Sequence, residues 1–446
     1  MSEKTFLPDS SMYAKQKASP PGVVATSSSS RFWRYSLILL CAGLLVLLTN
    51  VRAVSSLSVE ERVDNILSET PLTDGHDDLA SLIRSIYNNH VYGGNFTEPF
   101  THGSFPGQVD LPRLAEGKVG GTFWSVYVPC PENGTDFSDE NYATSVRHTM
   151  EQVDLMLRLQ MAYPNTFSTP PNGTTALDAF KAGKIISPLG MEGLHSIGNS
   201  LAHLRNFYSL GVAYATLTHS CNNRYADAAV VDGPDGNSVK ATPAWNGVSE
   251  AGKAVVFEMN RLGMIVDLAH VSSDTMRDVL GAGKDDWDGS IAPVIFSHSS
   301  AYAICPHPRN VPDDVLQLVK ERNSLVMVNF MPGYISCTPS DQSGELPQFD
   351  PAHATLDQVA DHIMHIGNLI GFDYVGLGSD FDGIPNVPRG LEDVSKFPDL
   401  IAELLRRGVS DEDAGKVAGG NLLRVWREVD GVARRMQAEG VRPVED

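Results

Sequence analysis

The chain has 446 residues, of which 42% are hydrophobic and 20% are charged, and its formal net charge at pH 7 is −20. This composition is typical of a globular protein with ample material for an apolar core, and the length allows one large domain or two smaller ones. The negative charge argues against nucleic-acid binding, because a phosphate backbone favours a basic protein face.

The N-terminal part differs in composition from the rest of the chain. Residues 1–34 are polar and rich in Ser and Pro, which predicts a disordered tail. An apolar stretch follows over 35–54, and its unbroken centre, 37–48, is short for a bilayer span of about 20 residues. We favour an uncleaved signal-anchor with a cytoplasmic N-terminus, because basic residues precede the stretch. A signal peptide cleaved after Ala53 is the alternative, and both predict export of the remaining chain.

Short apolar runs alternate with helical patterns from Ser58 onward. Ser58 and Glu61 form a capping-box pattern that predicts the start of a helix. The runs that we predict as strands are 71–75, 119–128, 185–191, 212–217, 264–268, 293–296, 325–330 and 374–378. Eight strands alternating with helices favour a (β/α)8 TIM-like barrel, and an open doubly wound sheet is the alternative. We therefore predict one α/β barrel domain over 55–430 and a polar C-terminal tail over 431–446.

Histidines and carboxylates stand where six of these strands end. They are His76, Asp77, Asp78, Glu192, His219, His270, His298, Asp380 and Asp382. The carboxyl ends of the strands are where a β/α barrel places its active site. Imidazole and carboxylate bind a borderline cation such as zinc, and one carboxylate can bridge two ions. The pattern therefore predicts a metal-dependent hydrolase, in which two ions would activate a bridging water and polarise a carbonyl.

Other histidines have a simpler interpretation. We expect His362 and His365, on a helix that begins near Thr355, to be solvated, and His195 and His203 to be structural. The sequence contains no phosphate-binding loop, no dinucleotide-binding turn and no GxSxG nucleophile motif.

Cysteines and sequons also indicate an exported protein. Four of the five cysteines form an even set without CxxC spacing: Cys130, Cys221, Cys305 and Cys337. This set favours disulfides over a thiolate zinc site, whereas Cys41 lies in the N-terminal apolar stretch. Three Asn-x-Thr triplets are candidate glycosylation sites: Asn95, Asn133 and Asn172.

Taken in order, these motifs resemble those of the membrane dipeptidases, zinc enzymes of the amidohydrolase-like barrel superfamily. The similar segments span about 60–430 and include DGHDDL at 74, GMEGLHSI at 190, LTHSC at 217, IVDLAHVS at 265 and GLGSDFDG at 376. The resemblance implies hydrolysis of dipeptides with a free C-terminal carboxylate by a water that bridges two zinc ions. The alternative is a related barrel amidohydrolase acting on N-acyl amino acids or β-lactam amides.

The resemblance also implies roles for single residues. One zinc ion would bind His76 and Asp78, the other would bind His270 and His298, and Glu192 would bridge them. The implied disulfides are Cys130–Cys221 and Cys305–Cys337.

Substrate contacts follow from the same resemblance. His219 would contact the tetrahedral intermediate, Arg309 would bind the substrate carboxylate, and Tyr334 would line the pocket. Asp380 would bind substrate and transfer the proton, with Asp382 as the alternative. The chain departs from the family at Asp77, where Asn is common, and it lacks the C-terminal lipid-anchor signal and intersubunit cysteine of mammalian members. We therefore expect membrane attachment through the N-terminal stretch and a non-covalent interface in any homodimer.

Overall fold

The computed structural model describes residues 57–445 except 234–236, 284–285, 341 and 343. The predicted tail over 1–34, the apolar stretch over 35–54 and Cys41 therefore lie outside the described residues. Of the helices that the structure does describe, none is both long enough and apolar enough to span a bilayer.

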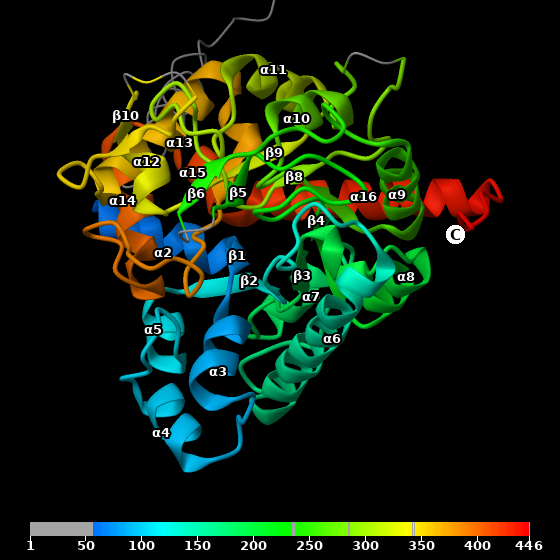
Figure 1. Cartoon of the computed structure of the whole chain (residues 1–446). Coiled ribbons are helices and arrows are strands. Elements are labelled where there is room, and N and C mark those ends of the chain that lie inside the picture. Colours follow the sequence, from blue (N-terminus) through cyan, green and yellow to red (C-terminus); the bar gives the residue numbers. More distant parts are fainter. Residues whose placement is uncertain (1–56, 234–236, 284–285, 341, 343, 446) are drawn as a thin grey trace, which may run out of the picture. The chain divides into compact units, whose positions relative to one another are not determined.

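Eight strands in the described part of the chain close into a parallel barrel (Figure 1). Their order around the barrel is β1 (Leu72–Asp77), β12 (Val375–Leu377), β9 (Leu325–Val328), β8 (Ile295–Phe296), β7 (Ile265–Asp267), β4 (Val212–Thr216), β3 (Leu189–Glu192) and β2 (Val119–Ser125). Every predicted apolar run overlaps one of these strands, although β1 and β3 extend past the predicted ends at residues 75 and 191. β12 pairs with β1 through Asp74 and Leu377. The closed barrel is confirmed, and the open-sheet alternative is wrong.

Helices connect the strands. The α-helices are α2 (Val59–Glu69), α3 (Leu79–Tyr87), α4 (Gly94–His102), α5 (Leu111–Glu116), α6 (Asp139–Ala162), α7 (Ala176–Lys181), α8 (Leu201–Ser209), α9 (Glu250–Leu262), α10 (Ser273–Val279), α11 (Asp313–Glu321), α12 (Pro332–Ile335), α13 (Leu356–Ile370), α14 (Phe397–Arg406), α15 (Asp411–Gly415) and α16 (Asn421–Ala438). Shorter helical segments are η1 (Leu194–Ile197), η2 (Phe372–Tyr374), η3 (Val394–Lys396) and η4 (Lys416–Gly420). Two hairpins, β5 (Val230–Asp232) with β6 (Ser238–Lys240) and β10 (Cys337–Thr338) with β11 (Gln348–Phe349), lie outside the barrel sheet.

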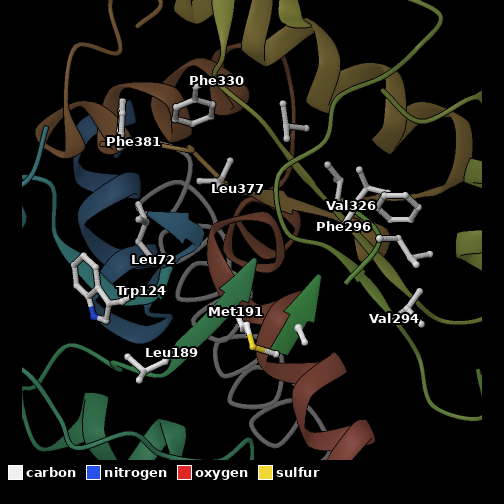
Figure 2. Packing of buried hydrophobic residues seen from close by; sticks show 14 of the residues in the cluster. Leu72, Trp124, Leu189, Met191, Val294, Phe296, Val326, Phe330, Leu377 and Phe381 are labelled. Atoms are coloured by element: carbon white, nitrogen blue, oxygen red, sulfur yellow. The ribbon is translucent and has the colours of Figure 1, made fainter. Parts of the chain in front are cut away.

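The core has two layers because successive strand residues point to opposite faces. Phe296 and Val326 belong to the larger apolar cluster, part of which Figure 2 shows. Their neighbours Ile295 and Leu325 belong to a second cluster, which also contains Trp426 of α16. The barrel strands are therefore buried on both faces, which explains why they appear in the sequence as nearly continuous apolar runs.

The C-terminal helix, drawn in red in Figure 1, extends beyond the predicted domain boundary. We predicted a polar tail from residue 431, but α16 continues to Ala438 and buries Val432, Ala433 and Met436. The polar residues between them lie on the outer face of an amphipathic helix, which resembles a tail when only the composition is considered.

The prediction that His362 is solvated is wrong. His362 is fully buried in α13, on the helical face that also carries Val359 and Ile363. Its Nδ1 accepts a hydrogen bond from the Ala301 amide at 2.9 Å, and its Nε2 donates to the Ile335 carbonyl at 2.9 Å. His365, one turn later, is partly exposed and pairs with Asp313.

The structural interpretation of the other two histidines agrees with the structure. His195 is buried, and its Nε2 lies 3.1 Å from the Val128 carbonyl oxygen. His203 lies with its Nδ1 2.8 Å from the Ile197 carbonyl oxygen.

Candidate active site

Glu192 lies at the centre of the predicted ligand cluster. It is the last residue of β3, and its Oε1 is 2.8 Å from His270 Nε2, 3.5 Å from His298 Nε2 and 3.6 Å from His76 Nε2. Asp78 completes the cluster with its Oδ2 3.1 Å from His76 Nε2. All five side chains are at most 5% exposed. The barrel thus brings together the five residues that the sequence analysis proposed as ligands.

Hydrogen bonds between β1 and the segment that follows β12 position the site residues from the two ends of the barrel sequence. Asp74, inside β1, accepts hydrogen bonds from the Ser379 amide at 2.8 Å and the Ser379 hydroxyl at 2.5 Å. The Asp380 amide donates to the His76 carbonyl, and the Asp78 amide donates to the Phe381 carbonyl. These bonds hold Asp380 beside the His76–Asp78 pair although the two segments are far apart in the sequence.

The cluster has the donor set of a metal centre. Three groups of described side chains hold their candidate ligand atoms within 4.8 Å of one another: His76, Glu192 and His298; Glu192, His219 and His270; and His76, Asp78 and Asp380. Glu192 belongs to two of them, as a bridging carboxylate would. A further group contains Cys130 and Cys221, but these sulfurs are joined in a disulfide and cannot bind a cation.

Burial shows why these residues suit a cation. Burial raises the pKa of Glu192 and lowers the pKa of His270 and His298 well below the usual value. The imidazoles of His270 and His298 are therefore neutral, the form in which histidine binds metal. At His76 the opposite holds, because the negative charges of Glu192 and Asp78 outweigh burial and raise its pKa. Asp78 Oδ1 is buried without a hydrogen-bond partner among the described residues. A cation would offset the unfavourable burial of such carboxylates, so the residues present fit zinc.

A cavity of about 330 Å³ opens beside the cluster. Its lining includes Glu192, His219, His270, Arg309, Tyr334 and Asp380. The Arg309 guanidinium lies 5.1 Å from the centre of the Tyr334 ring, and its buried Nε and Nη2 have no hydrogen-bond partner among the described residues. Two adjacent unpaired N–H groups match the two oxygens of a carboxylate.

Asp380 and Asp382, the two acids that follow β12, have different hydrogen-bond partners. Asp380 Oδ2 accepts from Asn329 Nδ2 at 3.0 Å, and this acid belongs to the group with His76 and Asp78. Asp382 Oδ1 accepts from the Gln108 amide, and the Asp382 amide donates back to Gln108 Oε1. Asp382 therefore binds the loop that precedes α5, whereas Asp380 lies beside His76 and Asp78, and both acids line the cavity.

Asp77, which the sequence suggested as an extra acid beside the site, is buried. Its Oδ1 accepts from the Leu79 amide at 2.9 Å, whereas its Oδ2 is buried without a partner among the described residues. Burial and the neighbouring charge of Asp382 raise the pKa of Asp77 well above its usual value. Asp77 joins none of the described cation-binding groups, so the extra acid lies behind the site.

Both implied disulfides are confirmed, Cys130–Cys221 and Cys305–Cys337. The first supports the site, because Cys130 Sγ lies 3.7 Å from His219 Nδ1. The second ties the segment after β8 to the strand that follows α12.

Several residues around the site were not singled out by the sequence analysis. Tyr214 Oη lies 2.6 Å from His76 Nδ1, Ser297 Oγ lies 2.9 Å from His298 Nδ1, and Asn329 contacts Asp380. The one available signal was Asp267, a charged residue within the apolar run 264–268, because a buried charge needs partners.

Comparisons with known proteins identify the family. A family profile described as Membrane dipeptidase (Peptidase family M19) matches residues 60–440. The chain is 46% identical over 387 residues to dipeptidase aclJ of Aspergillus oryzae. This alignment covers 86% of this chain and 83% of that protein. It is 44% identical over 371 residues to dipeptidase tcpJ of Claviceps purpurea, covering 83% and 79%.

A solved structure supports the fold. The probable dipeptidase PvdM from Pseudomonas aeruginosa aligns with a TM-score of 0.70 at 23% identity, over 84% of this chain and 99% of that one. Together, the barrel, the buried histidine–carboxylate cluster and the match over 60–440 show that this chain belongs to the membrane dipeptidase family and is a metallo-dipeptidase.

Proposed function

We propose that this protein is a zinc-dependent dipeptidase that cleaves dipeptides with a free C-terminal carboxylate. The observation that carries the proposal is the position of Glu192 Oε1, within 2.8–3.6 Å of three imidazole nitrogens. Arg309, whose Nε and Nη2 have no hydrogen-bond partner among the described residues, lines the same cavity. A cation site and a carboxylate site in one small cavity suit a substrate whose scissile amide lies close to its C-terminus.

The proposed cofactor is a pair of zinc ions. His76 and Asp78 would hold one ion, His270 and His298 the other, and Glu192 would bridge them, in keeping with its central position. When bound, the pair supplies an activated water and a polarised amide carbonyl.

Arg309 explains the preference for a dipeptide. Its free N–H groups bind the carboxylate of the second residue, and the Tyr334 ring beside the guanidinium helps to fix its plane. A longer peptide would place a neutral amide at this position and leave the buried guanidinium unpaired, which is strongly unfavourable.

Asp380 and His219 act on the reacting amide. The hydrogen bond from Asn329 fixes one oxygen of Asp380, and the carboxyl group lines the cavity, where it can carry a proton to the leaving amine. His219 is held between the Cys130–Cys221 disulfide and the His270 ring, whose centre is 4.4 Å away. From this position it can donate a hydrogen bond to the oxygen that develops negative charge.

An amide other than a dipeptide is the second candidate. Arg309 contacts only the carboxylate end of a substrate, so N-acyl amino acids and β-lactam amides with an adjacent carboxylate would meet the same guanidinium. A panel of matched substrates, each offered as dipeptide, N-acyl amino acid and β-lactam, separates the candidates. A higher kcat/KM for the acylated compounds would favour the second.

The metal proposal is tested on the purified protein by measuring zinc content and dipeptide hydrolysis before and after complete chelation. We expect two zinc ions per chain and loss of activity that returns when zinc is added back. Full activity in the metal-free protein would refute the proposal.

We also propose that the catalytic domain is extracellular or lumenal, anchored by 35–54, or secreted if that segment is cleaved. Two disulfides and the exposure of Asn95, Asn133 and Asn172 support an oxidising, glycosylating compartment. Because the four described cysteines are paired with one another, the described part of a homodimer would be held by non-covalent contacts. Mass determination of the mature N-terminus and a glycosidase-induced mass shift test these points.

A further inference from the structure

Two histidines from the two proposed zinc sites are each hydrogen-bonded through Nδ1 beneath the cluster. His76 Nδ1 lies 2.6 Å from Tyr214 Oη, and His298 Nδ1 lies 2.9 Å from Ser297 Oγ. The Ser297 hydroxyl in turn donates to Asp267 Oδ2 at 2.6 Å, and it lies near the Tyr214 hydroxyl. The two imidazoles are therefore supported by neighbouring side chains.

The protons in this set can be assigned from the chemistry of each group. A neutral histidine that binds a cation through Nε2 carries its proton on Nδ1, which needs an acceptor. Tyr214 Oη accepts from His76, which leaves its own proton available to the nearby Ser297 Oγ. Ser297 Oγ also accepts from His298 and donates onward to Asp267. The chain of donors ends there because an ionised carboxylate only accepts.

Asp267 is held firmly enough to serve as the end of this chain. Its Oδ1 accepts from the Ser297 amide at 2.7 Å and from the Ala269 amide at 3.0 Å. Its Oδ2 also accepts from Thr216 Oγ1 at 2.5 Å. Asp267 is fully buried, and its partners come from β4 and from the segments that follow β7 and β8.

The histidine orientations agree with this assignment. Both Nε2 atoms face Glu192 Oε1, at 3.6 Å for His76 and 3.5 Å for His298, and the two ring centres are 4.1 Å apart. His270 has no support of this kind. Its buried Nδ1 has no hydrogen-bond partner among the described residues, and only its Nε2 approaches His298 Nε2, at 2.9 Å.

We propose that Asp267, Ser297 and Tyr214 form one positioning network that fixes the tautomer and ring orientation of His76 and His298 and thereby links the affinities of both zinc sites. The inference rests on the proposed function, since it takes these histidines to bind zinc through Nε2. None of the three residues touches substrate. Tyr214 supports one histidine directly, whereas Ser297 supports both.

The test compares three substitutions in the metal-free protein. Tyr214→Phe removes the acceptor of His76, Ser297→Ala removes the junction, and Thr216→Val removes a different hydrogen bond to the same oxygen of Asp267. Zinc binding is measured by titration against a competing chromogenic chelator, which resolves two dissociation constants. Thermal unfolding of each metal-free variant reports any general loss of stability.

We expect Tyr214→Phe to weaken one zinc constant and Ser297→Ala to weaken both, each by about 10–100-fold. Thr216→Val should leave both constants near wild type even where it lowers the unfolding temperature. If the wild-type protein binds fewer than two zinc ions, the proposed function fails and the network fails with it. If the wild type binds two ions and Ser297→Ala changes the zinc constants no more than Thr216→Val, only the network is overturned. Should Ser297→Ala not fold, the comparison of Tyr214→Phe with Thr216→Val decides the same question.

Discussion

Replacing His362 by Leu should destabilise the barrel and also change how its stability depends on pH. The imidazole links three elements, because it accepts from the Ala301 amide after β8 and donates to the Ile335 carbonyl at the end of α12. Leucine fills similar space but leaves both buried backbone groups unpaired. At about 1–3 kcal/mol for each group, the expected loss near pH 7 is about 2–6 kcal/mol.

The pH dependence follows from burial. Burial lowers the pKa of His362 to about 4, from an ordinary value of 6.5. Between these values the unfolded chain binds a proton at this histidine that the folded protein does not bind, so wild-type stability falls as the pH falls from 6.5 toward 4. Over this whole pH range the lowered pKa of His362 reduces the unfolding free energy of the wild type by about 3 kcal/mol. Because the leucine variant lacks this contribution, its deficit relative to wild type should shrink toward pH 4.

Urea unfolding of the metal-free protein at a series of pH values measures both effects. His365→Leu is the matched control, because His365 lies one turn along α13, is partly exposed and pairs with Asp313. An exposed pair of this kind contributes at most about 1 kcal/mol. If His362→Leu and His365→Leu show the same midpoints and the same pH slopes, then the burial argument for His362 is refuted.

Three further predictions concern the site and the disulfides. Glu192→Gln should abolish detectable dipeptide hydrolysis and lower the zinc content. The control Glu151→Gln, on the surface, should change neither. Undiminished turnover in Glu192→Gln would contradict the bridging role. Arg309→Met should lower kcat/KM for a dipeptide by about 10–100-fold but hardly affect the already poor dipeptide amide, and an equal loss for both substrates would exclude carboxylate recognition. Removing Cys130–Cys221, a separation of 91 residues, should lower the free energy of unfolding by about 5 kcal/mol, and removing Cys305–Cys337, a separation of 32, by about 4 kcal/mol. Urea midpoints check the order, and only the first removal should also reduce kcat, because it frees His219.

The sequence alone was sufficient for the barrel and for the cluster of histidines and carboxylates at the strand ends. A strand buried on both faces leaves an apolar run of characteristic length, so all eight strands could be located without tertiary information. Once those runs were taken as parallel barrel strands, the residues after them had to converge at one end. This rule is why His76, Glu192 and His298 could be grouped although they are far apart in the chain.

Helix surfaces were less predictable. His362 and His365 are three residues apart in a polar-looking HxxH pattern, yet one is buried and the other is not. The end of the domain was misplaced for a related reason, since Val432 and Met436 of α16 are separated by charged residues. Which face of a helix is covered depends on the elements packed against it, and composition does not contain that information.

The detailed arrangement of the site required the closed barrel. The roles of Asp380 and Asp382 could not be distinguished in the sequence. Their hydrogen-bond partners differ, because Asn329 reaches Asp380 and Gln108 reaches Asp382 from distant segments. Tyr214, Asp267 and Ser297 likewise lie on or after three strands, and they meet only because the strand register sets them side by side. The sequence therefore determined which groups stand at the strand ends, since their spacing is local. The tertiary structure decided which groups hydrogen-bond, because that depends on register and barrel closure.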